Sequence, residues 1–343
     1  PISATGLPQA MLKLIKYLIL LAILAVLGAG AWLYQFARAP LRLSAEPLEF
    51  TVAPGSSLRA ATRQIVRAGV DMPEWAFEAV ARATVKPTDI KAGTYELPAG
   101  ATPLDLLGKL TRGEFALSDV KFIEGWTFRQ VRAALDAHPR IRHDTAGLPD
   151  ADVLRRLELP ITHPEGWFFP DTYVFPRGAS DVEILRSAHR AMEKRLAAAW
   201  AERQPGIPLA SPYEALILAS IVEKETGRPQ DRPLIAAVLH NRLRSGMRLQ
   251  ADPTVIYGLG PAFDGNIRKR DLLADTPYNT YTRDGLPPTP IAMPGRAALE
   301  ATLRPAESPA LYFVARGDGS SEFSRTLEEH NRAVTRYQRG DRP

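Results

Sequence analysis

The stretch Ser211-Pro-Tyr-Glu-Ala-Leu-Ile-Leu-Ala-Ser-Ile-Val-Glu-Lys-Glu-Thr-Gly227 predicts a buried helix with two carboxylates on its last turn. Its first four residues match a capping box with proline at the first helical position, which is typical of a helix start. Residues 215–222 are apolar almost all round, as in a helix that is covered on every side. Gly227 is expected to end the helix in a left-handed conformation.

The two carboxylates, Glu223 and Glu225, are candidates for acid–base chemistry. Burial and the C-terminal end of a helix both disfavour a negative charge, so either pKa is expected to lie above its usual value. The two side chains are about 200° apart around the helix, so they cannot flank one bond as a pair. Glu225 follows Val222 by three residues and Ile221 by four, and therefore continues the apolar face. The alternative is a helix end whose charges reach into water.

Composition narrows the class of protein. The chain has 343 residues, which allows two domains and an appendage, and its hydrophobic fraction of 45% is ordinary for a globular protein. It contains no cysteine, which excludes disulfides, thiolate catalysis and cysteine-bound metals. The net charge of +5 would suit an anionic partner, but we find no nucleic-acid-binding motif and expect no nucleic acid as a partner.

Residues 17–36 form an uncharged, apolar run that predicts a transmembrane helix, because twenty residues span a hydrocarbon core of about 30 Å. Lys13 and Lys16 precede it, which predicts that segment 1–16 lies in the cytoplasm, with the rest of the chain in the periplasm. Trp32 marks the aromatic belt at the far end. We expect the part of the chain from about residue 45 onward to fold without this anchor.

Two alternatives remain for the N-terminal region. Ala29-Gly-Ala31 also fits the cleavage pattern of a signal peptide, in which case the apolar run would be removed. Met11 is a possible true start, so that residues 1–10 would lie upstream of the native protein.

Beyond the anchor, the pattern predicts an α+β protein with two folded parts. Residues 46–115 read as strand, two helices, strand and a third helix, with helix starts at Ser56 or Ser57, at Pro73 and at Thr102. Residues 118–340 form a larger mixed α+β domain. In it, Glu165-Gly-Trp-Phe-Phe-Pro-Asp-Thr-Tyr-Val-Phe175 carries five aromatic residues, which suit either the apolar faces of sugar rings or a hydrophobic core.

Seven landmarks in one order resemble the endolytic murein transglycosylases, the MltG or YceG-like family. They are Glu165-Gly-Trp-Phe-Phe-Pro-Asp-Thr-Tyr173, Ile221-Val-Glu-Lys-Glu-Thr226, Asn241-Arg-Leu243, Gly246-Met-Arg-Leu-Gln-Ala-Asp-Pro-Thr-Val-Ile-Tyr257, Tyr278-Asn-Thr-Tyr281, Gly285-Leu-Pro-Pro288 and Leu311-Tyr-Phe-Val-Ala315. The resemblance covers the chain from the apolar run to about Tyr337. It implies a LysM-like unit at residues 46–115 and a catalytic domain at 118–340.

The resemblance also implies the reaction, a lytic cleavage of the β-1,4 bond between N-acetylmuramic acid and N-acetylglucosamine that leaves 1,6-anhydro ends and ends the growth of nascent strands. Glu225 matches the family's catalytic glutamate. Our predicted substrate-binding residues are Glu223, Asn241, Gln250, Asp252, Thr254, Tyr257, Asn279 and Tyr281. The implied partners are murein strands, the inner membrane and peptidoglycan synthases, and no cofactor or metal is expected. The family commonly has a histidine near Ser321, which is absent here.

Two other functions are compatible with parts of the sequence. A non-catalytic glycan-binding scaffold would need only the anchor and the LysM-like unit. A pyridoxal-phosphate lyase would need a Schiff-base lysine and a phosphate cradle, and Lys224 has no glycine loop beside it. Detection of anhydro-ended glycan products would separate the enzyme from both.

Overall fold

The structure is a computed structural model that describes residues 9–339 and divides into two compact units. Within the described residues, the first unit comprises 9–118 and 176–178, and the second comprises 119–175 and 179–339. Part of the predicted cytoplasmic segment, residues 1–8, and residue 340 of the predicted catalytic domain lie outside the described residues. The protein is mixed α+β, as predicted from the sequence.

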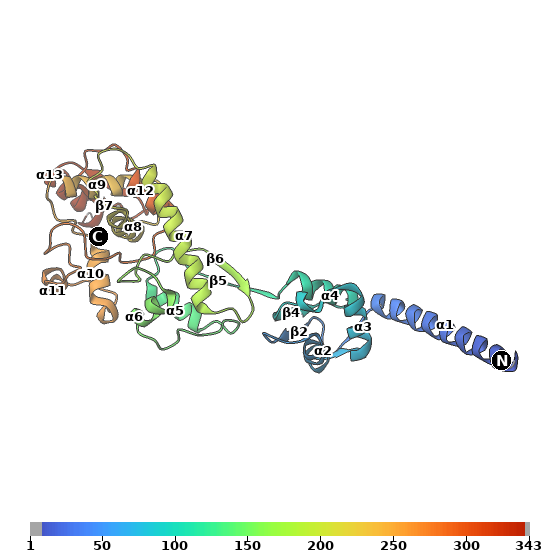
Figure 1. The fold of residues 1–343 in the computed structure, drawn as a ribbon. Helices are drawn as coiled ribbons and strands as arrows, with labels where there is room; N and C mark the ends of the chain where they lie inside the picture. The colour runs from blue at the N-terminus through green and yellow to red at the C-terminus, as the bar shows by residue number, and fades with distance from the viewer. Residues whose placement is uncertain (1–8, 340–343) are drawn as a thin grey trace. The chain divides into compact units, whose positions relative to one another are not determined.

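The first unit consists of one long helix followed by short helices and paired strands (Figure 1). In chain order its elements are α1 (Gln9–Arg38), β1 (Arg42–Leu43), β2 (Leu48–Val52), α2 (Leu58–Arg67), β3 (Val70–Asp71), α3 (Glu74–Thr84), η1 (Pro87–Asp89), β4 (Gly93–Leu97) and α4 (Pro103–Arg112). Strand β1 pairs with β3, and β2 pairs with β4 in an antiparallel ladder from Leu48 opposite Leu97 to Val52 opposite Gly93.

The helix starts in this unit follow the predicted caps. Ser57 accepts a hydrogen bond from the Ala60 amide at the start of α2, and Thr102 forms a reciprocal capping box with Asp105 at the start of α4. Gly113 ends α4 with φ 74°, a conformation that glycine adopts at no steric cost. The order β2, α2, α3, β4 therefore agrees with the predicted strand, two helices and strand.

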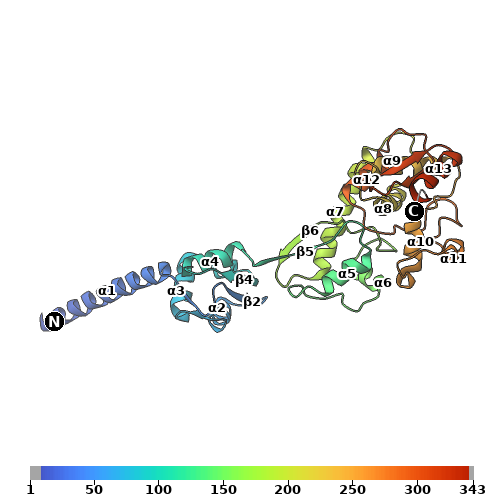
Figure 2. The ribbon, with the colours of Figure 1, turned by 180° about the vertical axis from the view of Figure 1, so that it is seen from behind.

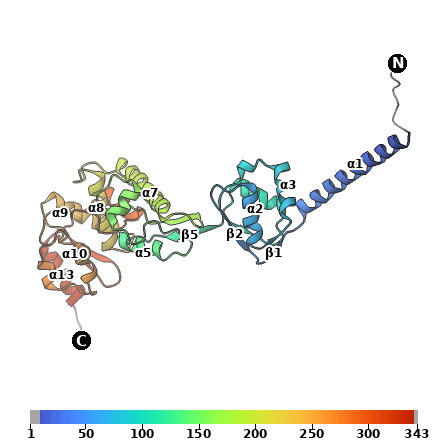
Figure 3. The same ribbon diagram turned by 60° about the horizontal axis from the view of Figure 1, so that its bottom comes forward.

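Helix α1 is long and apolar enough to cross a bilayer, and it continues directly into the fold of the first unit (Figure 3). Ala37 is buried in the core of this unit, and Leu33 and Phe36 pack against the same core. Trp32 stacks on Trp75 of α3, with ring centroids 5.2 Å apart. The core of the first unit thus includes the last turns of the apolar helix, well before residue 45.

The second unit is built mainly from helices (Figures 1 and 2). Its elements are β5 (Leu117–Lys121, whose first residues belong to the first unit), α5 (Phe128–Asp136), α6 (Asp150–Leu157), β6 (Thr172–Pro176), α7 (Asp181–Ala201), α8 (Pro212–Glu225), α9 (Arg232–Arg244), α10 (Asp252–Leu259), η2 (Gly260–Ala262), α11 (Lys269–Leu273), α12 (Arg296–Leu303), β7 (Tyr312–Ala315), β8 (Ser321–Ser324), α13 (Leu327–Val334) and η3 (Thr335–Arg339). Strand β5 pairs with β6, and β7 pairs with β8.

Helix α8 lies at the centre of this unit and contacts α7, α9, α10 and α12. All residues from Ala215 to Val222 are buried, which confirms the prediction from their apolar pattern. Ser211 caps the helix as predicted, but Glu214 accepts a hydrogen bond from the Ala210 amide and does not close the box on Ser211.

The predicted left-handed end of α8 at Gly227 is wrong. The helix ends at Glu225, and Thr226 follows with an extended backbone of φ −150° and ψ 135°. The chain therefore leaves the helix straight from the catalytic candidate, without a further turn.

The aromatic segment 165–175 contributes to the core. Phe168 and Phe169 are buried, as is Phe175 in strand β6, and Phe168 stacks on Phe128 of α5 with centroids 4.9 Å apart. These three phenylalanines belong to two buried clusters, one around α8 and the other around α5 and the start of α7. Of the two interpretations of this segment, sugar binding or hydrophobic core, the second therefore applies to these three phenylalanines. Glu165 in the same segment has a different environment.

The packing of α1 predicts how much of this helix a shortened chain must keep for the first unit to retain its stability. A chain that starts at Trp32 keeps Leu33, Phe36 and strand β1, whereas a chain that starts at Ala45 loses them. Because burial of a large apolar side chain is worth about 1.5–3 kcal/mol, we expect the shorter chain to be less stable by roughly 2–4 kcal/mol. Urea unfolding of the two chains measures the difference.

A matched pair of variants in the longer chain controls for the change in length. Phe36→Ala should reproduce part of the loss, because this ring packs against the core. Tyr34→Ala should have little effect, because Tyr34 is 61% exposed. Equal stability of the chains that start at Trp32 and Ala45 would contradict the assignment of these turns to the core.

Candidate active site

Glu225 is the last residue of α8 and is half-buried, with Arg242 of α9 and Asp252 of α10 close enough to act on its charge. Among residues 9–339 its carboxyl group has no hydrogen-bond partner. The pKa of Glu225 is raised to about 7, chiefly by burial and then by the negative charge of Asp252, while the positive charge of Arg242 opposes this shift. A large share of Glu225 is thus protonated near neutral pH, as a general acid requires.

Arg242 of α9 is a buried cation close to Glu225, and it was missed in the sequence analysis. Its guanidinium group donates to the carbonyl oxygens of Leu249 and Leu311, both at 2.7 Å. The side chain also lies 5.3 Å from the ring of Tyr312. Arg242 stands in the centre of the landmark Asn241-Arg-Leu243, but the helical pattern alone did not show that an arginine points inward.

Asp252 and Tyr281 complete the surroundings of Glu225. Asp252 is the first residue of α10, where the helix N-terminus favours a carboxylate. The Tyr281 hydroxyl donates to Asp252 Oδ1, and burial raises the pKa of Tyr281 well above its usual range. Glu225, Arg242, Asp252 and Tyr281 therefore form one cluster, which we call the Glu225 cluster. Of the predicted site residues, the structure brings together Glu225, Asp252 and Tyr281.

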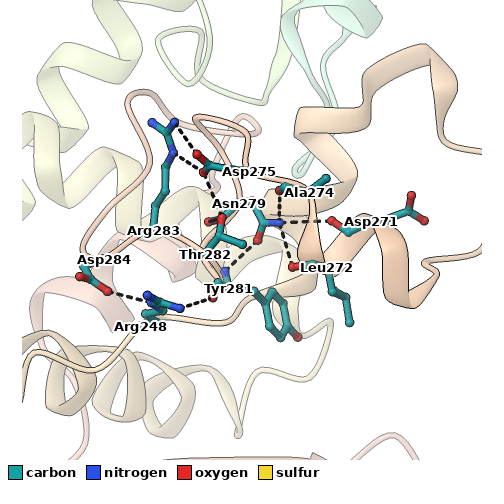
Figure 4. Close-up of polar contacts among 10 residues, drawn as sticks. All are labelled: Arg248, Asp271, Leu272, Ala274, Asp275, Asn279, Tyr281, Thr282, Arg283 and Asp284. Carbon is teal, nitrogen blue, oxygen red and sulfur yellow. Dashed lines mark hydrogen bonds and ion pairs between the residues drawn. The ribbon is translucent and has the colours of Figure 1, made fainter.

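The loop that carries Tyr281 is held by Asn279, which is buried (Figure 4). Asn279 Nδ2 donates to the carbonyl oxygens of Asp271, Leu272 and Ala274, and its Oδ1 accepts from the Tyr281 amide at 2.8 Å. Asn279 therefore has its polar atoms occupied by backbone and acts on the cluster through the position of Tyr281.

Ion pairs on both sides support the same loop. Arg248 pairs with Asp284 and donates to the Tyr281 carbonyl oxygen, while Arg283 pairs with Asp275, as Figure 4 shows. All four charged residues are exposed, so each pair contributes little stability by itself.

Thr254 and Gln250 lie at the start of α10 on the other side of this loop. Thr254 is fully buried, donates to the Ala251 carbonyl oxygen and lies 2.9 Å from the Thr280 hydroxyl. Gln250 adopts φ 48° and its amide donates to the Thr280 carbonyl oxygen, while its side chain is exposed. Thr254 therefore fixes α10 against the loop, and the Gln250 side chain is left accessible.

Glu223 and Asn241 point away from the Glu225 cluster. Glu223 Oε2 accepts from the Gly295 amide at the start of α12, and its Oε1 lies 3.6 Å from Arg232. The Glu223 side chain is only 7% exposed, and burial raises its pKa as well. Asn241 Nδ2 donates to the carbonyl oxygens of Ser308 and Ala310. Both residues therefore connect helices and loops around the cluster.

Tyr257 also lies on α10, but its side chain contacts Glu165 and Tyr278 and does not belong to the Glu225 cluster. Its hydroxyl donates to Glu165 Oε2 at 3.0 Å, and its ring meets that of Tyr278 edge-on at 4.9 Å. Glu165 has a pKa raised to about 7, chiefly by burial, and we did not predict it as a site residue. The signals in the sequence were its place in the landmark at 165–173 and its position beside aromatic residues.

Ser321 stands near the place where the family commonly has a histidine. Ser321 begins β8, and its amide donates to Asp231 Oδ2. His330 of α13 stacks on Tyr312, whose ring in turn lies under Arg242. Arg242 lowers the pKa of His330, as burial does more strongly, so His330 is a neutral imidazole at the edge of the cluster.

One group of possible metal ligands occurs among residues 9–339, at Asp136, His143 and Asp181. The Asp181 carboxylate already accepts hydrogen bonds from the amides of Asp144 and Thr145 and from the Thr145 hydroxyl. These hydrogen bonds show that Asp181 connects the start of α7 to the segment at Asp144 and Thr145.

Comparison with known proteins shows relatives that match this chain over most of its length. The model of the YceG-like family matches residues 50–336. A protein of Bacillus subtilis (strain 168) named endolytic murein transglycosylase is 32% identical over 308 residues, which cover 84% of each chain. A protein of the same name from Streptococcus pneumoniae serotype 2 is 27% identical over 361 residues, and the match covers 92% of this chain and 64% of that protein.

A solved structure agrees with these matches. The crystal structure of a yceG-like protein from Listeria monocytogenes is similar with a TM-score of 0.54 and 31% identity, over 84% of this chain and 98% of the other. Together with the family match over 50–336, this extent of similarity identifies the family predicted from the landmarks. The chain belongs to the YceG-like family.

Proposed function

We propose that this protein is a membrane-anchored endolytic murein transglycosylase. It cleaves the β-1,4 bond between N-acetylmuramic acid and N-acetylglucosamine inside glycan strands and leaves 1,6-anhydro ends. The names of the relatives support the class of reaction. The observation that carries the proposal is the carboxyl group of Glu225, which is half-buried, has no hydrogen-bond partner among residues 9–339 and has a pKa raised to about 7 by loss of solvent.

A single acid of this kind suffices for the reaction. Protonated Glu225 donates its proton to the glycosidic oxygen as the bond to the muramic acid C1 breaks. The resulting carboxylate then accepts the proton of the muramic acid 6-hydroxyl as that oxygen attacks C1 and closes the anhydro ring. The nucleophile belongs to the substrate, so neither an enzyme nucleophile nor an activated water is required.

The charges around Glu225 suit both steps. Asp252 raises the pKa of Glu225 and so keeps the proton in place before bond cleavage, while Arg242 stabilises the carboxylate that cleavage leaves. Tyr281 fixes the direction of Asp252 through its hydrogen bond. In this proposal Asp252 and Tyr281 line the sugar that is cut, and the exposed Gln250 side chain contacts the strand beside it.

The position of Asp252 also supports a second candidate reaction. Two carboxyl groups near one glycosidic bond can hydrolyse it, with one as acid and the other as base for a water molecule. The products distinguish the two reactions, because hydrolysis gives reducing muramic acid ends and the transglycosylase gives anhydro ends.

We propose that α1 anchors the enzyme in the inner membrane, with the N-terminus in the cytoplasm and both units in the periplasm. Lys13 and Lys16 flank the cytoplasmic end, and Trp32, stacked on Trp75, marks the outer interface. Such an anchor would hold the enzyme where new strands emerge and where peptidoglycan synthases work, which suits a role in ending strand growth.

We further propose that the first unit is LysM-like and contacts N-acetylglucosamine polymers. The order β2, α2, α3, β4 supports this, and so does the family resemblance. A spacer that binds nothing would have the same order of elements, and a scaffold for wall synthesis would need only this unit and α1. Anhydro-ended products exclude the scaffold as the whole function.

Replacement of the acid tests the proposal directly. Glu225→Gln keeps the shape of the side chain but cannot donate a proton to the leaving oxygen. General acid–base catalysis is worth roughly 10²–10⁴-fold, so release of anhydro-ended fragments from purified murein should fall by at least this range. Mass analysis of the released fragments measures the loss and the chemistry of the ends.

Glu223→Gln is the matched control, two residues away on the same helix. It should cost less activity than Glu225→Gln, because Glu223 faces Gly295 and Arg232. A larger loss for Glu223→Gln, with both variants folded by circular dichroism, would show that the catalytic glutamate is wrongly assigned.

The raised pKa predicts the dependence on pH. Glu225 must be protonated to act as the acid, so activity should fall as pH rises through about 7. Asp252→Asn removes a negative charge that raises the pKa of Glu225, so the fall should move to lower pH in the remaining activity. Rates measured from pH 5 to 9 test both expectations, and a flat wild-type profile would refute the role of a single titrating acid.

A further inference from the structure

A cavity with a volume of about 710 Å³ lies in the larger unit. It is bounded by the start of α5, the segment 163–165, α10 with η2, and Tyr278. Glu225, Asp252 and Tyr281 are not among its lining residues. The volume falls within the range of roughly 300–1,000 Å³ that is typical of small-molecule sites.

Glu165 lies in the wall of this cavity and is only 4% exposed. Its Oε1 accepts from the Phe128 amide at 2.9 Å, and its Oε2 accepts from the Tyr257 hydroxyl at 3.0 Å. Each oxygen has a second lone pair, or a proton when the acid is neutral, which can meet a ligand. Burial raises the pKa of Glu165 to about 7, so much of this group is an uncharged acid at neutral pH.

The rest of the lining is mainly aromatic and apolar, and it also includes the exposed cation Arg129. Phe128, Tyr257, Phe263 and Tyr278 provide ring surfaces. Burial lowers the pKa of His163, which is therefore neutral, and the one carboxylate in the lining besides Glu165, Asp150, is paired with Arg132 at 3.1 Å. Aromatic faces beside a few polar groups suit a sugar ring with hydroxyl and acetamido groups.

Helix α10 connects this cavity to the Glu225 cluster. Asp252 belongs to the cluster, and Tyr257, five residues later, lines the cavity. Five residues of helix correspond to roughly 7.5 Å along the axis. An enzyme that cuts within a strand has to hold sugars on both sides of the bond.

We propose that the cavity between α5 and α10 is a binding site for one N-acetylated sugar ring of the glycan strand, separate from the Glu225 cluster, with Glu165 and Tyr257 as its polar contacts and Phe263 as a stacking surface. The inference rests on the proposed function, because it names a further subsite for the same substrate. It assigns to Glu165 the recognition of substrate and no proton transfer to the bond that is cut.

Binding without turnover tests this inference. The probe is the uncharged tetramer of N-acetylglucosamine, titrated calorimetrically into the full-length Glu225→Gln variant in detergent. Phe263→Ala in this background should weaken binding roughly three- to tenfold, because an aromatic contact is worth about 0.5–1.5 kcal/mol. Glu165→Gln should also weaken it, and Leu273→Ala is the control, since Leu273 is 68% exposed and lies outside the cavity lining.

The outcomes separate this inference from the proposed function. If Phe263→Ala and Glu165→Gln bind the tetramer like their parent, the cavity does not hold the sugar and the inference is wrong. Weaker binding by Asp252→Asn then places the tetramer at the Glu225 cluster, and unchanged binding by this variant as well places it at the first unit. Absence of tetramer binding to the parent at millimolar concentration also overturns it. Either result leaves the release of anhydro ends by the wild-type enzyme unaffected, because that assay does not involve the tetramer.

Discussion

The burial of α8 is the constraint on which the larger unit depends. Four helices contact it, and residues 215–222 have no face left for water. The last turn of such a helix cannot solvate two carboxylates freely. Glu223 is compensated by the Gly295 amide and by Arg232, whereas Glu225 has no hydrogen-bond partner among residues 9–339. Desolvation of that one carboxyl group is what places its pKa near neutrality.

Much of the polar chemistry around Glu225 holds backbone in place. Asn279 connects the end of α11 to Tyr281, Thr254 connects α10 to the same loop, and Arg242 connects α9 to two loop carbonyl oxygens. These ties fix the direction of Asp252 and Tyr281, which have few other constraints. The site is thus positioned by buried hydrogen bonds, each costly to leave unmade, more than by its exposed ion pairs.

Glu165 and Glu225 have similar pKa values for the same reason but in different settings. Burial dominates both shifts. Glu165 accepts two hydrogen bonds that hold it rigidly between α5 and α10. Glu225 lies between a carboxylate and a guanidinium group and keeps both oxygens available. A rigidly bonded acid suits recognition, and an acid without fixed partners suits proton transfer, which is why we assign the two roles as we do.

The sequence by itself determined the local elements, because helix caps and apolar periodicity depend on near neighbours. It predicted α8 with its cap at Ser211, strands β2 and β4 and the helix caps of the first unit, and the apolar helix. Only the tertiary structure decided which polar residues meet. Arg242 stands on the helix that follows Glu225, and Glu165 is far from Tyr257 along the chain. The inward direction of both side chains depends on packing between helices. The turn after Glu225 and the docking of α1 into the first unit were also decided by contacts that no local pattern contains.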